Sequence, residues 1–196
     1  HMGGGLSATN PGYHIFASVI ISMTGAPDYI IQGIIASFFS TLIILSGFML
    51  VRQVWGVVPG FITAILATFS ASDILMINWA GYPNIIALAL IPIIFYIYLK
   101  PKAFSSKKYI TITSLIIAAL FLTHIFSALV FLSITLLVLI ISCIFSNRAN
   151  FSIKKIILHV VPILLALLLV SPYLLNVFPV YFGSEGAITG TVPIIK

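Results

Sequence analysis

Two histidines and one aspartate interrupt the long apolar runs of this chain. His14 lies in a short apolar segment, Asp73 follows an apolar run, and His124 lies within the longest one. A carboxylate can take the proton of an attacking hydroxyl, and an imidazole can bind phosphate or metal or act as a base near neutral pH. The sequence therefore predicts a site with Asp73 as the catalytic base and with His14 and His124 as substrate-binding residues.

Each of these residues also has a purely structural interpretation. His14 suits a polar position at a membrane surface, and Asp73 suits a solvated carboxylate at the end of a helix. His124 is the most costly of the three, because an ionisable group at membrane depth needs a cavity or a partner. The neighbouring Thr123 could be that partner. The residues alone leave both interpretations open.

A short polar connection at 73–84 supplies a second group of candidate residues. Trp79, Tyr82 and Asn84 lie in it, and we expect them to form a second wall of the substrate site. Trp79 and Tyr82 also suit a membrane interface, where amphipathic rings concentrate, and this interpretation is favoured. No spacing of ligands specifies a metal, although a divalent metal is the cofactor that would suit a phosphate-bearing substrate.

The composition indicates the class of protein that must position these residues. Hydrophobic residues make up 61% and charged residues 6% of the 196 residues, and the mean hydropathy is +1.26. These values are typical of an integral membrane protein and exclude an ordinary soluble domain. The net charge of +6 is then a signal of topology, and it does not indicate a nucleic-acid partner.

The segment at 13–24 is the only apolar segment too short to cross a bilayer. As a helix it rises about 18 Å, against a hydrocarbon core of about 30 Å. His14, Ser18 and Ser22 fall on one helical stripe, and apolar residues cover most of the remaining surface. The pattern predicts an interfacial amphipathic helix whose histidine-serine stripe is turned away from lipid.

Five longer apolar runs follow the interfacial segment. The run at 109–145 would reach about 55 Å as one helix, and basic residues flank it on both sides. Because basic flanks should share one side of the membrane, we expect a hairpin that turns near Thr123 and His124. The chain is thus predicted to be an all-α, polytopic membrane helix bundle with about six transmembrane helices. The predicted spans are 29–51, 54–72, 83–99, both arms of 109–145, and 156–175.

The charges give this single membrane domain an orientation. Arg52 and the basic loops at 100–108 and 148–155 fall on one side, which we expect to be cytoplasmic, in a multi-pass protein of the cell membrane. The outer loop and interfacial helix at 1–25 and an outer tail at 176–196 fall on the other side, beyond the six spans at 29–175. The candidate site therefore faces outward.

The order of these elements resembles the membrane module of family C glycosyltransferases over residues 10–175. The resemblance rests on Pro-Gly-Tyr-His at 11–14, Trp-Ala-Gly-Tyr-Pro-Asn at 79–84 and Leu-Thr-His at 122–124. It implies an outer-face glycosyltransferase that takes its sugar from a polyprenyl-phosphate donor among membrane lipids. In that family an acidic catalytic residue precedes the interfacial helix, after a first transmembrane helix.

This chain departs from the family pattern at that point, because it has no acidic residue before Asp28. We expect the acid to lie in a missing N-terminal part of the same protein, or to be lacking. We also expect His1 to be non-native and the chain to be a piece of a longer one. The alternative function is a non-catalytic transporter, or a lipid-binding or assembly subunit. The lack of inverted repeats weighs against a transporter.

Overall fold

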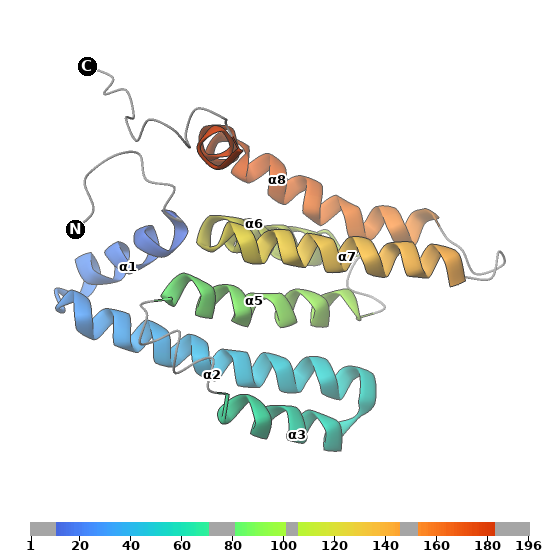
Figure 1. Cartoon of the computed structure of the whole chain (residues 1–196), viewed down its shortest axis with the longest axis horizontal. Coiled ribbons are helices and arrows are strands. Elements are labelled where there is room, and N and C mark those ends of the chain that lie inside the picture. Colours follow the sequence, from blue (N-terminus) through green and yellow to red (C-terminus); the bar gives the residue numbers. More distant parts are fainter. Residues whose placement is uncertain (1–10, 71–80, 101–105, 146–152, 183–196) are drawn as a thin grey trace.

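The protein is described by a computed structural model that places residues 11–70, 81–100, 106–145 and 153–182. Within these ranges it consists of α-helices and has no strand, which confirms the predicted all-α class (Figure 1). The helices are α1 (Pro11–Thr24), α2 (Asp28–Trp55), α3 (Val57–Thr68), α5 (Tyr82–Tyr98), α6 (Lys107–Thr123), α7 (Ile125–Phe145) and α8 (Ile153–Phe182).

From α2 to α8, successive helices run back and forth along the long axis of the molecule (Figure 1). α1 is the exception, since it lies across the end of the bundle where α2 and α5 begin. The predicted short helix before the first span is thus confirmed. Gly25, with a φ of 66°, ends it, and its N–H donates to the carbonyl of Ile21 at 2.8 Å.

α5 packs in the middle of the bundle and takes part in two hydrophobic cores. Ile86 joins buried residues of α1 and α2 in one core. Ala87 and Ile94 join buried residues of α6, α7 and α8 in the other. Two alanines of α5, Ala87 and Ala89, are fully buried, and such small side chains let helices approach closely. α5 therefore connects the two halves of the bundle.

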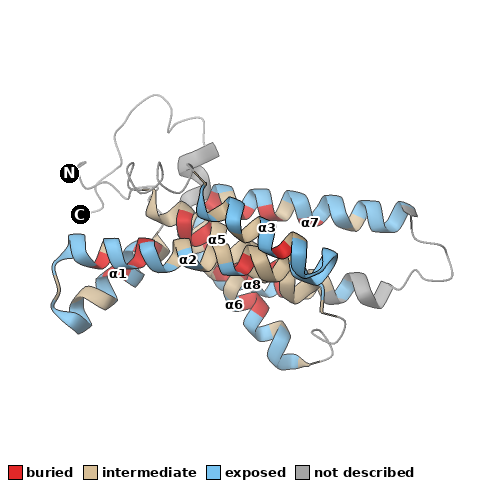
Figure 2. Ribbon diagram, turned by 90° about the horizontal axis from the view of Figure 1, so that it is seen from below, coloured by how far each residue is buried: buried red, intermediate tan, exposed pale blue. Residues whose placement is uncertain are grey.

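The outward surface of the helices is strongly apolar. Phe38, Leu66 and Leu168 are 62%, 68% and 70% exposed, and Figure 2 shows exposed residues along most of α3 and α7. By length and composition, two helices in the described part of the chain are able to cross a membrane, at Asp28–Trp55 and Ile125–Ile144.

The length and composition of the described helices do not confirm the predicted bundle of six spans. The apolar helices Val57–Thr68 and Tyr82–Tyr98 are shorter than a typical span, whereas α8 has 30 residues and includes the apolar stretch His159–Leu175. The largest difference concerns 54–72, because α2 continues to Trp55 and α3 then has only 12 residues. A helix of that length rises about 18 Å.

The turn from α2 to α3 explains why the predicted boundary between these helices was wrong. The predicted boundary lay at Arg52, but the helix passes it and breaks at Gly56, whose φ and ψ are 95° and −176°. This region of backbone conformation is essentially restricted to glycine. The chain reverses there, and Gly60 then packs on the side chains of Phe48 and Arg52.

The hairpin predicted in the run at 109–145 is confirmed. α6 ends at Thr123, His124 has extended backbone angles (φ −157°, ψ 100°), and α7 begins at Ile125. A single non-helical residue therefore separates the two helices. Figure 2 shows α6 and α7 opening apart as they leave this turn.

Replacing Gly56 by alanine should lower the free energy of unfolding by about 1–3 kcal/mol, because a side chain is strained at this φ. The matched control is Gly33→Ala in the exposed part of α2, where an added Cβ meets no atom within 4 Å. There alanine should stabilise the helix by up to about 1 kcal/mol. Unfolding in mixed micelles, followed by circular dichroism, measures both. Equal effects of the two variants would contradict the proposed role of Gly56.

Candidate functional site

A cavity of about 480 Å³ lies where α1 meets α2, α5 and α6. Almost every group that lines it is apolar, and Thr123 is the single hydroxyl-bearing residue in the lining. The volume falls within the range of ligand pockets, about 300–1,000 Å³. The lining residues are Gly12, Ile15, Phe16, Val19, Phe39, Ile86, Leu90, Ala119, Leu122 and Thr123.

The position of α1 over this cavity depends on a close contact between Gly12 and Leu122. A Cβ atom on Gly12 would lie 2.8 Å from the carbonyl carbon of Leu122 and 2.9 Å from its oxygen. Only glycine permits so close an approach of two backbones. The first turn of α1 therefore rests directly on the last turn of α6, and the rest of α1 extends over the cavity.

α1 also borders a second, open groove of about 450 Å³. His14, Ser18 and Ser22 line this groove together with Met23 and the two residues shared with the cavity, Ile15 and Val19. The predicted stripe of His14, Ser18 and Ser22 thus exists, but it is exposed and faces the open groove. Ile15 and Val19 line both spaces, and so separate the apolar cavity from the open groove that bears His14, Ser18 and Ser22.

The stripe of α1 that the protein buries is the one next to His14. Tyr13 and Ala17 are buried, and they pack on Ile31, Ile35 and Ile86. This stripe was not predicted, although the one-turn spacing of Tyr13 and Ala17 is a signal in the sequence that could have indicated it.

Tyr82, another predicted site residue, packs against the buried stripe of α1. Its ring stacks on that of Tyr13, with centroids 5.8 Å apart and an interplanar angle of 18°. The Tyr13 hydroxyl is buried and has no hydrogen-bond partner within the described structure. Burial, followed by the nearby Tyr82 and Asp28, raises the pKa of Tyr13 to about 12. This hydroxyl therefore stays protonated at neutral pH.

His124 has a defined local role at the turn between α6 and α7. Its Nδ1 atom lies 2.8 Å from Ser127 Oγ and accepts the backbone N–H of Ser127 at 3.2 Å. This geometry is that of an N-cap, because the N–H three residues later would otherwise lack a partner. Thr123, predicted as an alternative partner, bonds instead to the carbonyls of Ala119 and Leu120.

The N-cap assigns a protonation state to His124. Nδ1 must be unprotonated to accept the N–H of Ser127, which assigns the ring proton to Nε2. His124 lies in the turn outside both helices, and burial lowers its pKa from the ordinary value of 6.5. The neutral ring is therefore the stable form, with Nε2–H as the remaining donor.

The predicted convergence of His14, Asp73 and His124 on one cavity is not found for the two histidines. His14 lines the open groove, and His124 lines neither this groove nor the apolar cavity. Asp73 and Trp79 lie outside the described residues. Asn84 is partly buried in the first turn of α5, where its backbone N–H donates to Gly81 at 2.9 Å.

No three His, Cys, Asp or Glu side chains come together among the residues that the structure describes. These residues therefore offer no complete ligand set for the divalent metal considered above. Comparison with protein families, with curated proteins and with solved structures finds no match to this chain. The resemblance to family C glycosyltransferases thus rests on the sequence motifs alone.

Acid should destabilise the protein through His124. Burial lowers the pKa of His124 in the folded protein, whereas in the unfolded chain it is about 6.5. Between these two pKa values the unfolded chain binds more protons than the folded protein. The stability that is present above a pH of about 6.5 is therefore lost as the pH falls through the folded pKa. His124→Asn keeps a capping acceptor that does not titrate, and it should flatten this dependence. His124→Ala should lower the free energy of unfolding by about 1 kcal/mol at every pH above about 6.5, because it removes the cap.

Thermal unfolding in detergent micelles between pH 5 and pH 8 measures these effects. A second control is His14→Asn, which removes an exposed histidine that makes no cap. This variant should keep the pH dependence of the parent protein. An unchanged pH dependence in His124→Asn would show that the cap does not determine it.

Proposed function

We propose that this chain is part of an outer-face membrane glycosyltransferase, and that the end of the bundle around α1 holds its polyprenyl-phosphate-linked sugar donor. The observation that carries the proposal is the pair of spaces on either side of Ile15 and Val19. An isoprenoid chain suits the apolar cavity, and a phosphate and sugar suit the groove lined by His14, Ser18 and Ser22. The two spaces together match an amphipathic ligand.

The membrane setting of the proposal is a multi-pass bundle of six crossings in the cell membrane. Two helices have the length and composition of spans, and the alternating course of α2 to α8 supports six crossings (Figure 1). The large exposed apolar side chains need a lipid partner, because such a surface is costly in water. Shorter helices can be accommodated by local thinning of the bilayer or by flanking residues that reach its surface.

In the proposed reaction the acceptor hydroxyl attacks the anomeric carbon of the sugar. The bond between that carbon and the phosphate oxygen breaks, and the polyprenyl phosphate leaves. A carboxylate takes the hydroxyl proton, and Asp73 or an acidic residue in a preceding part of the protein would supply it. His14, which lines the groove, would donate to the phosphate.

A lipid-binding subunit without chemistry is the second candidate function. It is favoured by one observation, that none of the described residues lining the cavity or the groove carries a carboxylate. Both functions require binding of the lipid phosphate. They differ in turnover, so release of polyprenyl phosphate from a labelled polyprenyl-phosphate sugar by a protein that includes the preceding segment favours the transferase. Binding without release favours the subunit.

Filling the cavity should weaken binding of undecaprenyl phosphate. Ala119 lines the cavity, and a phenylalanine there would exclude at least two methylene groups of the chain, which is worth about 1.6 kcal/mol or about tenfold in Kd. The control is Leu115→Phe, one turn earlier on the outward face of α6, where the side chain is 55% exposed. It should bind within about twofold of the parent protein.

Native mass spectrometry of the purified chain in detergent, titrated with undecaprenyl phosphate, measures both affinities. Unchanged binding by Ala119→Phe would place the isoprenoid chain elsewhere. The proposal of this cavity as the donor site would then be abandoned.

Cysteine labelling in intact cells tests the proposed orientation. The native Cys143 is first replaced by alanine, and single cysteines are placed at Ser106, before α6, and at Pro27, before α2. An impermeant thiol reagent should label the cysteine at 27 and spare the one at 106 until the cells are permeabilised. The reverse pattern would put α1 and its groove on the cytoplasmic side and exclude an outer-face enzyme.

A further inference from the structure

A polar pocket of about 300 Å³ lies between α2 and α5 at the end of the bundle away from α1. Met49, Arg52 and Gln53 line it from the last turns of α2, and Tyr96 lines it from the last turns of α5. A guanidinium, an amide and a phenol thus surround a space between two helices whose other exposed residues are largely apolar. Nothing in the proposed transfer reaction uses this pocket.

Arg52 lines this pocket and Lys100 lies over the ring of Tyr96, a lining residue, and neither cation has an acidic partner in the described part of the chain. The guanidinium carbon of Arg52 lies 5.9 Å from the ring centroid of Phe48, and Lys100 Nζ lies 4.5 Å from that of Tyr96. Asp28, the one acidic residue in the described ranges, begins α2, about 36 Å along the helix from Arg52. The pocket therefore carries a net positive charge.

The helix dipoles account for only part of this charge. Arg52 lies in the last turn of α2, and Lys100 follows the last turn of α5. The end of a helix there carries about half a negative charge, so two helix ends balance about one of the two cations. The rest of the positive charge is available to an anion.

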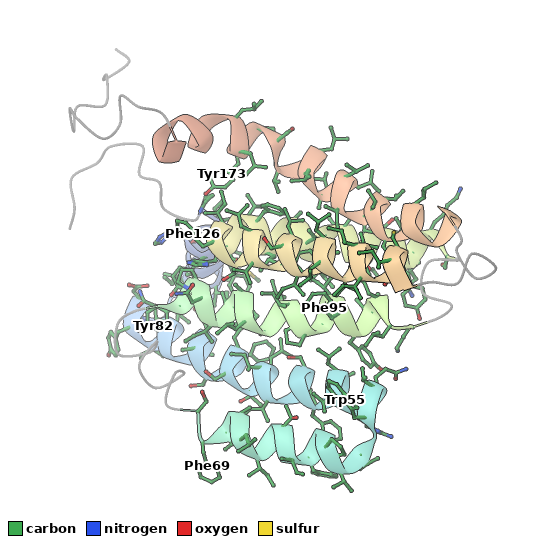
Figure 3. The ribbon with its side chains drawn as sticks, turned by 45° about the vertical axis from the view of Figure 1, so that its right-hand side comes forward. Trp55, Phe69, Tyr82, Phe95, Phe126 and Tyr173 are labelled. Atoms are coloured by element: carbon green, nitrogen blue, oxygen red, sulfur yellow. The ribbon has the colours of Figure 1, made fainter. Side chains whose placement is uncertain are left out.

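The surroundings of the pocket are those of a membrane surface. Trp55, the last residue of α2, is 69% exposed (Figure 3). Tyr109, which follows the exposed Lys107 and Lys108 at the start of α6, is 40% exposed. Exposed aromatic rings and lysines at the ends of apolar helices are typical of the headgroup region. Met49 lies on the inner side of the pocket, one turn closer to the bilayer centre than Arg52.

We propose that this pocket binds the phosphodiester headgroup of an anionic phospholipid. The Arg52 guanidinium donates to two phosphate oxygens, Lys100 adds charge, and Gln53 and Tyr96 provide hydrogen-bonding groups for the headgroup. The acyl chains extend along the apolar surface beyond Met49. Basic pockets between helices on the cytoplasmic side are suited to such lipids. The proposal rests on the membrane insertion of the bundle, and it is independent of the glycosyltransferase activity.

A lipid is favoured over free phosphate because the pocket opens between apolar helices. Arginine provides the planar pair of donors that matches a phosphate. A free phosphate would gain the charge contacts alone, whereas a lipid would also bury its chains against the helices. The two ligands are therefore distinguished by competition.

The test measures lipid binding to the purified chain in detergent by native mass spectrometry. Dioleoyl phosphatidylglycerol should bind about tenfold more tightly than dioleoyl phosphatidylcholine, because its headgroup carries a net negative charge. Arg52→Gln should remove this preference. Lys108→Gln removes a charge at the same end but outside the pocket, and it should change the preference by less than about twofold. Arg52→Lys, which keeps the charge and the fold, should show a smaller loss than Arg52→Gln.

Three results would overturn the proposal. Equal binding of the two lipids would remove the need for an anion site. Equal losses in Arg52→Gln and Lys108→Gln would indicate general surface charge. Displacement of phosphatidylglycerol by millimolar inorganic phosphate would indicate a site for the free anion. Binding of undecaprenyl phosphate to Arg52→Gln, and of phosphatidylglycerol to Ala119→Phe, should each match the parent protein, so that failure at one end is distinguishable from failure at the other.

Discussion

The close packing of α5 within the bundle is the constraint on which the other contacts depend. Ala87 and Ala89 are fully buried, and their small side chains let the neighbouring helices approach α5 closely. Ile86 carries this packing into the core shared with α1 and α2, and Ile94 carries it into the core shared with α6, α7 and α8. Because one helix joins both cores, the position of α1 relative to α6, and with it the cavity between them, follows from α5.

The two ends of the bundle offer different chemistry. At one end α1 rests on α6 through Gly12 and Leu122, and an apolar cavity lies beside an open groove that bears His14, Ser18 and Ser22. At the other end α2 and α5 finish in basic residues around a small polar pocket. The apolar interior between the ends has few polar groups, and buried hydroxyls such as Thr113 and Ser114 bond to carbonyls one turn earlier on their own helix. The cavity, the groove and the small polar pocket all lie at these ends, within the described part of the chain.

His124 shows how a residue chosen as a functional candidate can have a structural explanation. Its position was predicted from charge and length, and the break between α6 and α7 occurs there. Its ring then caps α7 by accepting the backbone N–H of Ser127. The sequence had suggested Thr123 as its partner instead. A histidine at an N-cap keeps one free nitrogen, so capping and ligand binding remain compatible.

The sequence by itself determined the all-α class, the short first helix and the turn at His124, because helix formation and its interruption depend on neighbouring residues. It did not determine that α3 is short or that Tyr13 stacks on Tyr82. Nor did it determine that His14 lines an open groove while His124 caps α7. Those features depend on how helices distant in the chain fit together. In a chain that is 61% hydrophobic, nearly every helix face is apolar, so periodicity does not distinguish a face that packs against another helix from one that stays exposed. Which face is buried depends on how the side chains of different helices fit together, and this is seen only in the tertiary structure.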